Sequence, residues 1–126
     1  MGLGIAVIQN LLELKKLGYL KNINNVLELG SQELYLQASD LKELVKSANL
    51  DVNQINNIKN VNNWPKKPWC SSKEFYDFLG IKSYQSIDLN GEHNSINHDL
   101  NLPFLDKQKF NTFDLVTDFG TAKHTF

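Results

Sequence analysis

The sequence predicts an α/β fold, in which about four mainly parallel strands form a sheet flanked by helices. Short apolar runs typical of buried strands alternate along the chain with segments of helical periodicity, and they lie at residues 26–30, 84–89, 95–98 and 113–117. Strands separated by helices favour parallel crossover connections. Acidic residues recur at or just after the ends of these runs, which is where α/β sheets bind ligands.

Composition and charge exclude several classes of function. A chain of 126 residues is one domain at most, and its net charge of -1 gives no electrostatic case for nucleic acid. The apolar run Gly2–Leu12 is shorter than the roughly twenty residues of a membrane-spanning helix. Cys70 is the only cysteine, so no disulfide closes within the chain. We therefore expect a soluble, cytoplasmic protein with an inert thiol and no membrane partner.

The N-terminal third contains two predicted helices around one strand. Apolar residues recur at helical spacing over Leu3–Leu17, and Gly18 follows as a helix terminator. Val26–Gly30 reads as a buried strand that turns sharply at its glycine. Gln32–Ala48 again has helical spacing, which predicts a second helix directly after that turn.

The middle of the chain is predicted to be an inserted loop around residues 49–70. Asn49–Asn63 is irregular and rich in asparagine, and the prolines of Trp64–Trp69 exclude a regular strand ladder. A short helix then begins at Ser71 or Ser72 and ends at Gly80.

Three positions at the predicted strand ends suit an adenosine-containing ligand. Gly30 lets the backbone approach a ligand closely, and the amides of a following helix N-terminus attract anions. Asp88, at the end of the next strand, suits the two hydroxyls of a ribose because a carboxylate accepts from both. Asp99 is placed to accept from an exocyclic amine such as that of adenine.

Four segments in the same order resemble the motifs of class I S-adenosylmethionine-dependent methyltransferases. Val26–Ser31 resembles their first motif and Ser86–Gly91 their acidic second motif. Asn97–Phe104 is similar to the adenine-side acid with its Leu-Pro-Phe turn, and Phe113–Thr121 to the fourth strand and the loop facing the transferred methyl. The resemblance implies a Rossmann-like sheet, S-adenosyl-L-methionine as cofactor and methyl transfer to an unidentified acceptor.

The resemblance also assigns roles to individual residues. It implies that Glu28 and the backbone of Gly30 and Ser31 hold the methionine portion, and that Asp88 binds the ribose. The remaining assignments are Leu89 in the cofactor site, Asp99 and Leu100 around the adenine, Thr117 and Asp118 near the methionine amino group and methyl donor, and His124 as candidate base.

The sequence departs from that family in two ways. Gln32 follows where the family usually repeats glycine, which we expect to narrow the approach to the cofactor. The family's later strands have no counterpart before Phe126, so we expect residues 1–126 to be an incomplete domain. Residues 1–25 would be its N-terminal helix and lead-in, and residues 26–126 its cofactor-binding half. The last strand would then present an open edge that favours self-association.

Three other interpretations stay open. A non-catalytic module with the first half of the fold is one, and it is favoured by Gln32 and by the missing strands. Asp118-Phe119-Gly120 matches the magnesium-binding triplet of kinases, and His98-Asp99-Leu100 faintly resembles their catalytic loop. The kinase asparagine after that loop, the strand lysine and the third glycine of the glycine-rich loop are absent. A cluster of possible metal ligands has no recognisable zinc spacing, so we expect no metal site; its members are Glu92, His93, His98 and Asp99.

Overall fold

A four-stranded parallel sheet lies at the centre of the computed structural model, which describes residues 2–104, 106–109 and 112–119. The strand order is β5-β4-β2-β6, and every pairing is parallel. The strands are β2 (Asn25–Leu29), β4 (Ser83–Asp88), β5 (Ile96–Asn97) and β6 (Leu115–Asp118). In chain order the sheet runs third, second, first, fourth, as in the first four strands of doubly wound nucleotide-binding sheets. The predicted α/β fold with four parallel strands is confirmed, and it is compatible with a Rossmann-like fold.

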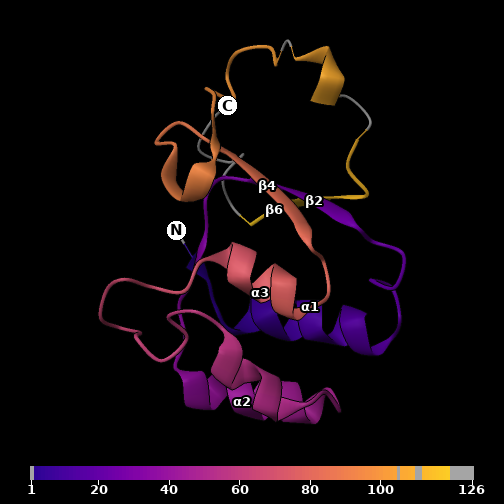
Figure 1. The fold of residues 1–126 in the computed structure, drawn as a ribbon, viewed down its shortest axis with the longest axis vertical. Helices are drawn as coiled ribbons and strands as arrows, with labels where there is room; N and C mark the ends of the chain where they lie inside the picture. Colours follow the sequence, from indigo (N-terminus) through magenta and orange to yellow (C-terminus); the bar gives the residue numbers. More distant parts are fainter. Residues whose placement is uncertain (1, 105, 110–111, 120–126) are drawn as a thin grey trace.

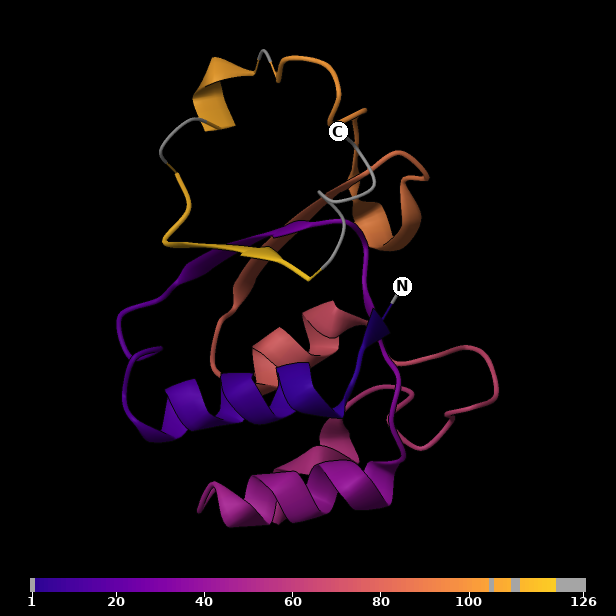
Figure 2. The same ribbon diagram turned by 180° about the vertical axis from the view of Figure 1, so that it is seen from behind.

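The three described α-helices and one 3₁₀ helix form two layers on one side of this sheet. Figures 1 and 2 show α1 (Ile5–Lys16) and α3 (Ser72–Phe78) against the sheet, with α2 (Ala38–Ser47) and the 3₁₀ helix η1 (Val52–Asn57) beyond α1. The described residues between β5 and β6, which include the 3₁₀ helix η3 (Lys107–Lys109), lie on the opposite side. The carboxyl ends of β2, β4 and β6 point to the same end of the sheet, on the left in Figure 1. None of the described helices is long and apolar enough to cross a membrane.

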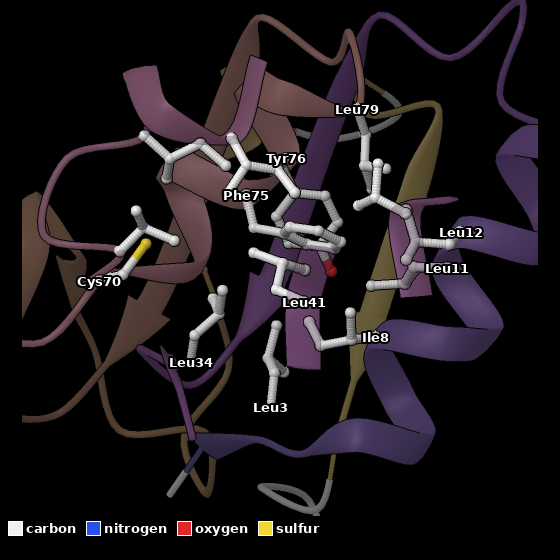
Figure 3. Close-up of a cluster of buried hydrophobic side chains, with 14 of the residues drawn as sticks. Leu3, Ile8, Leu11, Leu12, Leu34, Leu41, Cys70, Phe75, Tyr76 and Leu79 are labelled. Atoms are coloured by element: carbon white, nitrogen blue, oxygen red, sulfur yellow. The ribbon is translucent and has the colours of Figure 1, made fainter. Parts of the chain in front are cut away.

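The hydrophobic core fills the space between the sheet and the three helices, as Figure 3 shows. Helix α1 buries residues at the helical spacing of the sequence, namely Ile8, Leu11 and Leu12. Phe75 and Tyr76 of α3 meet them from above, and both are fully buried. Removing a fully buried aromatic side chain of this kind costs about 3–5 kcal/mol, so α3 is an integral part of the fold.

Strand β2 has one fully buried face and one partly open face. Val26 and Glu28 are inaccessible to solvent on the side of the helices, whereas Leu27 and Leu29 alternate with them and are half-buried on the other side. A carboxylate therefore lies in the helix-facing core, where sequence patterning leads one to expect an apolar residue.

The predicted helix Gln32–Ala48 is wrong in its first part. Residues Glu33–Leu34 form the short strand β3, which pairs in parallel with β1 (Gly2–Leu3), and α2 begins only at Ala38. The reason is a local alternation of period two, in which Gln32, Leu34 and Leu36 are buried and the residues between them are half-buried. Gly2 allows this pairing, because a Cβ there would lie 2.4 Å from the Tyr35 ring.

The segment predicted as an inserted loop contains one short regular element, η1, between α2 and α3. Its two tryptophans pack with Tyr35, with ring centroids 4.8 Å apart for Trp64 and 5.2 Å apart for Trp69. The loop is thereby fastened to the extended segment that follows β2. The predicted helix after Ser71 and the strands near residues 84–89, 95–98 and 113–117 are confirmed as α3, β4, β5 and β6.

Candidate functional site

The turn after β2 is joined to the end of β4 by two short hydrogen bonds. The Gly30 N–H donates to the carbonyl of Ile87 at 2.7 Å, and the Ser31 N–H donates to Oδ2 of Asp88 at 2.7 Å. Gly30 has φ +85°, a left-handed backbone conformation that residues other than glycine adopt only at a cost in free energy. The glycine thus lets the chain turn sharply at the point where the Asp88 carboxylate meets a backbone amide.

The Asp88 carboxylate is half-buried and keeps acceptor capacity. Its Oδ1 accepts from the Asn90 N–H at 3.3 Å, a long bond, while Oδ2 is the partner of Ser31. A carboxylate offers about four acceptor positions, so hydroxyl groups of a ligand can still be bound there. The neighbouring Leu89 side chain is 66% exposed, which places an apolar surface beside the carboxylate.

The end of β5 adjoins the same region. The His98 N–H donates to the carbonyl of Asp88 at 3.4 Å, so Asp99 and Leu100 follow directly beside the end of β4. Both are half-buried, and Asp99 Oδ1 accepts from the backbone N–H of Asn101 at 2.9 Å. The residues predicted for ribose and adenine therefore come together at adjacent strand ends.

The residues predicted for the methionine portion are divided between two faces of the sheet. Glu28 and Thr117 are partners in the β2–β6 register, and both side chains are buried toward the helices. Asp118 follows as the partner of Leu29, and its side chain is exposed. Only Asp118 of these three is open to solvent at the strand ends. His124 lies outside the described residues.

Glu28 accepts two short hydrogen bonds on the same oxygen. The hydroxyls of Ser72 and Tyr84 donate to its Oε1 at 2.5 and 2.6 Å, and Tyr76 completes the group by donating to Thr117 at 3.2 Å. Burial raises the pKa of the Glu28 carboxyl above its ordinary value, although the hydrogen bonds from Ser72 and Tyr84 oppose this shift. Burial and the nearby Glu28 carboxylate also raise the pKa of Tyr84, which keeps its hydroxyl a donor.

Sequence reasoning misses this buried polar group. The sequence around Ser72 indicates only a helix cap, and the two tyrosines read only as parts of a helix and a strand. The available signal is the alternation at Tyr84 and Ser86, which puts two hydroxyl side chains on one face of β4. Nothing in the sequence indicates that Glu28, on the adjacent strand, shares that face with them.

A different set of possible ligand groups converges beside this site. Side-chain atoms of Glu33, Glu92 and His93 all lie within 4.8 Å of one another, and His93 Nε2 is 2.8 Å from Glu33 Oε1. In the sequence, His98 and Asp99 lie close to Glu92 and His93 and are expected to belong to the same cluster. Instead His98 Nε2 lies 3.0 Å from the carbonyl of Leu102, and its ring contacts Phe104.

Gln32, expected to narrow the approach to the cofactor, is buried rather than directed to solvent. Its backbone carbonyl accepts a hydrogen bond from the Ser72 N–H at 3.0 Å, which ties the turn after β2 to the start of α3.

Comparison of the chain with known protein families, with curated proteins and with solved structures finds no match.

Proposed function

We propose that this chain supplies the cofactor-binding half of an S-adenosylmethionine-dependent methyltransferase whose acceptor substrate is unidentified. The observation that carries the proposal is the contact between the Ser31 amide and the Asp88 carboxylate at adjoining carboxyl ends of β2 and β4. Parallel α/β sheets bind nucleotides outside the carboxyl ends of their strands, near the point where the strand order reverses. Here that point is β2, from which the chain continues first to β4 and later to β6.

The adenosine side of the ligand fits the residues present. Asp88 would accept hydrogen bonds from the ribose hydroxyls, and the exposed Leu89 side chain would cover one side of the base. Asp99 and Leu100, at the next strand end, would frame the adenine. All four residues come from two neighbouring strand ends, so one ligand could contact them together.

The methionine side fits less well. Helix α2 begins at Ala38, so its N-terminal amides do not directly follow Gly30. Glu28 is fully buried, and we therefore assign it a positioning role in which it holds α3 against the end of β2. The N–H groups of Gly30 and Ser31 already donate to Ile87 and Asp88, so the groups that would contact the methionine portion are the carbonyl oxygens of Gly30 and Ser31 and the exposed side chain of Asp118.

S-adenosylmethionine supplies an electrophilic methyl group on a sulfonium sulfur. The protein's part in such a reaction is to bind and orient the two reactants and to exclude water. Asp118, at the end of β6, is the described acidic residue placed to accept a proton or to orient an acceptor. His124 stays a candidate base on sequence grounds.

One alternative is favoured by a specific observation. A non-catalytic module that recognises adenosine alone would need Asp88 and the adenine-side residues, but not a helix N-terminus beside Gly30. The late start of α2 and the buried carboxylate of Glu28 agree with such a module.

Titration calorimetry with S-adenosylhomocysteine and with adenosine tests the proposal. The wild-type chain should bind S-adenosylhomocysteine saturably and more tightly than adenosine. Asp88→Asn should weaken binding by about tenfold or more, since it loses charged hydrogen bonds to the ribose but keeps an acceptor for Ser31. Asp77→Asn, which removes the same charge from an exposed ion pair on α3, should leave affinity unchanged.

Two results decide against the methyltransferase. Equal affinity for adenosine and S-adenosylhomocysteine would favour the non-catalytic module. A folded chain that binds neither compound would contradict the assignment of a cofactor site to these strand ends.

A further inference from the structure

A pocket of about 490 Å³ lies beside the candidate cofactor site and belongs to none of the predicted roles. The segments that form it are β3, the loop containing residues 64–69 and the turn after β4, and Figures 1 and 2 show that loop and turn along the same side of the molecule. Its lining residues are Glu33, Lys67, Pro68, Trp69, Glu92 and His93.

One wall of the pocket gathers two carboxylates around a histidine. Glu33 Oε1 lies 2.8 Å from His93 Nε2, and an oxygen of Glu92 lies within 4.8 Å of both ligand atoms. Two carboxylates this close repel each other, and a cation between them relieves that repulsion. This wall is therefore suited to a positively charged group.

Another part of the pocket lining is a tryptophan ring held in a fixed orientation. The Trp69 Nε1–H donates to the carbonyl of Pro65 at 3.0 Å, and the rings of Tyr35 and Trp64 pack against it at 5.2 and 5.3 Å. Because the indole is held from several sides, it presents a preorganised surface to the pocket at little entropic cost.

The pocket already holds an ammonium group of the protein itself. Lys67 Nζ lies 4.9 Å from the centroid of the Trp69 ring, within the roughly 6 Å range of a cation–π interaction. Lys67 is exposed, and its stem is flexible enough to leave the ring without disturbing the backbone. We regard this lysine as a replaceable occupant that marks where a cation is stable.

We infer that this pocket binds the protonated primary amine of a small molecule, with the ammonium between the Trp69 ring and the carboxylates of Glu33 and Glu92. An aromatic face with nearby carboxylates favours an organic cation, since an indole ring offers no ligand atom to a metal ion. The inference does not depend on the methyltransferase proposal. Where both hold, the pocket identifies a molecule that carries an amine as the acceptor class.

The test uses n-butylammonium as the probe and n-butanol as its neutral counterpart. Binding is measured from the fluorescence emission of Trp69 in the Trp64→Phe variant, in which Trp69 is the remaining tryptophan. We expect a saturable response to n-butylammonium and none to n-butanol. Lys67→Ala should increase the affinity several-fold because it removes the internal competitor. Lys66→Ala removes the same charge from the neighbouring residue, which does not line the pocket, and should have no such effect.

The carboxylates are tested in the Glu33→Gln, Glu92→Gln double variant, which should lower the affinity for n-butylammonium by about tenfold or more. Circular dichroism and thermal melting establish that each variant is folded. The inference is overturned by an equal response to n-butanol, or by no saturable response in folded Lys67→Ala. It is also overturned if Zn²⁺ binds at Glu33, Glu92 and His93 while n-butylammonium does not, because the cluster is then a metal site. None of these three results bears on S-adenosylhomocysteine binding, so the two proposals fail separately.

Discussion

The backbone N–H of Ser31 donates to Oδ2 of Asp88 at 2.7 Å, although the two residues lie in different strand-end segments 57 positions apart. The contact fastens the turn after β2 to the end of β4. Asp88 therefore has a structural role as well as the proposed role in binding ribose. Variants that keep an acceptor at this position separate these two roles.

We predict that Asp88→Ala destabilises the fold by about 1–3 kcal/mol, because the part-buried Ser31 amide loses its partner. Asp88→Asn retains a side-chain oxygen and should cost clearly less. Urea unfolding of the wild type and the two variants measures the difference. Equal stability of all three proteins would show that the Ser31 N–H donates its hydrogen bond to water when Asp88 is removed.

Stability should depend on pH through Glu28. Burial raises its pKa in the folded protein, so the folded state binds the proton more tightly than the unfolded chain does. The stabilising contribution is complete below the ordinary carboxyl pKa of about 4.5 and is lost as pH rises through the raised value. As pH rises above about 4.5, unfolding free energies should therefore fall more steeply for the wild type than for Glu28→Gln.

The control for this pH series is Glu43→Gln, which removes an exposed carboxylate from α2. Its pH dependence should follow that of the wild type. Identical curves for Glu28→Gln and the wild type would mean that Glu28 does not dominate the titration.

Gly30→Ala should destabilise the protein by roughly 1–2 kcal/mol, because alanine resists the left-handed conformation at φ +85°. Gly18 has nearly the same φ of +84°, and a Cβ added there would meet nothing within 4 Å. Gly18→Ala is thus a matched control for backbone strain. Both variants should lose stability through the same backbone strain, but only Gly30→Ala should alter affinity for S-adenosylhomocysteine. A binding defect in both would point to a general loss of folding.

Cys70 should react with thiol reagents only when the structure opens. Burial, and secondarily the negative charge of Glu74, raises the pKa of the Cys70 thiol to about 12, so the reactive thiolate is scarce near neutral pH. Since it is the only cysteine, labelling by a disulfide reagent reports on one site. The labelling rate should rise steeply across the urea transition. Rapid labelling of the native protein would show that the region between η1 and α3 opens locally.

The strands were predictable because their signal is local. Val26–Gly30 and Phe113–Thr117 are short apolar runs next to turn residues. Such runs predict buried strands independently of the rest of the chain. The parallel arrangement followed from the helical segments between them. The start of α2 was not predictable in this way, since β3 depends on pairing with β1 at the other end of α1.

The candidate site was predictable in part for a similar reason. Gly30, Asp88 and Asp99 each follow a strand, and parallel strands bring their ends together. The burial of Glu28 depends on hydroxyls donated by Ser72 and Tyr84, which lie 44 and 56 positions away. The approach of Glu33 to His93 likewise spans 60 positions. The hydrophobic periodicity of a single segment does not predict contacts between residues so far apart in the sequence.

The most direct test of the central claim is to follow backbone amide resonances of the isotopically labelled chain during titration with S-adenosylhomocysteine. We predict saturable shifts concentrated at the strand ends, at Gly30, Ser31, Leu89 and Leu100, with the amides of α2 unchanged. Saturating ligand that leaves those four amides unmoved, or that shifts resonances only elsewhere, would contradict the placement of a cofactor site between β2 and β4.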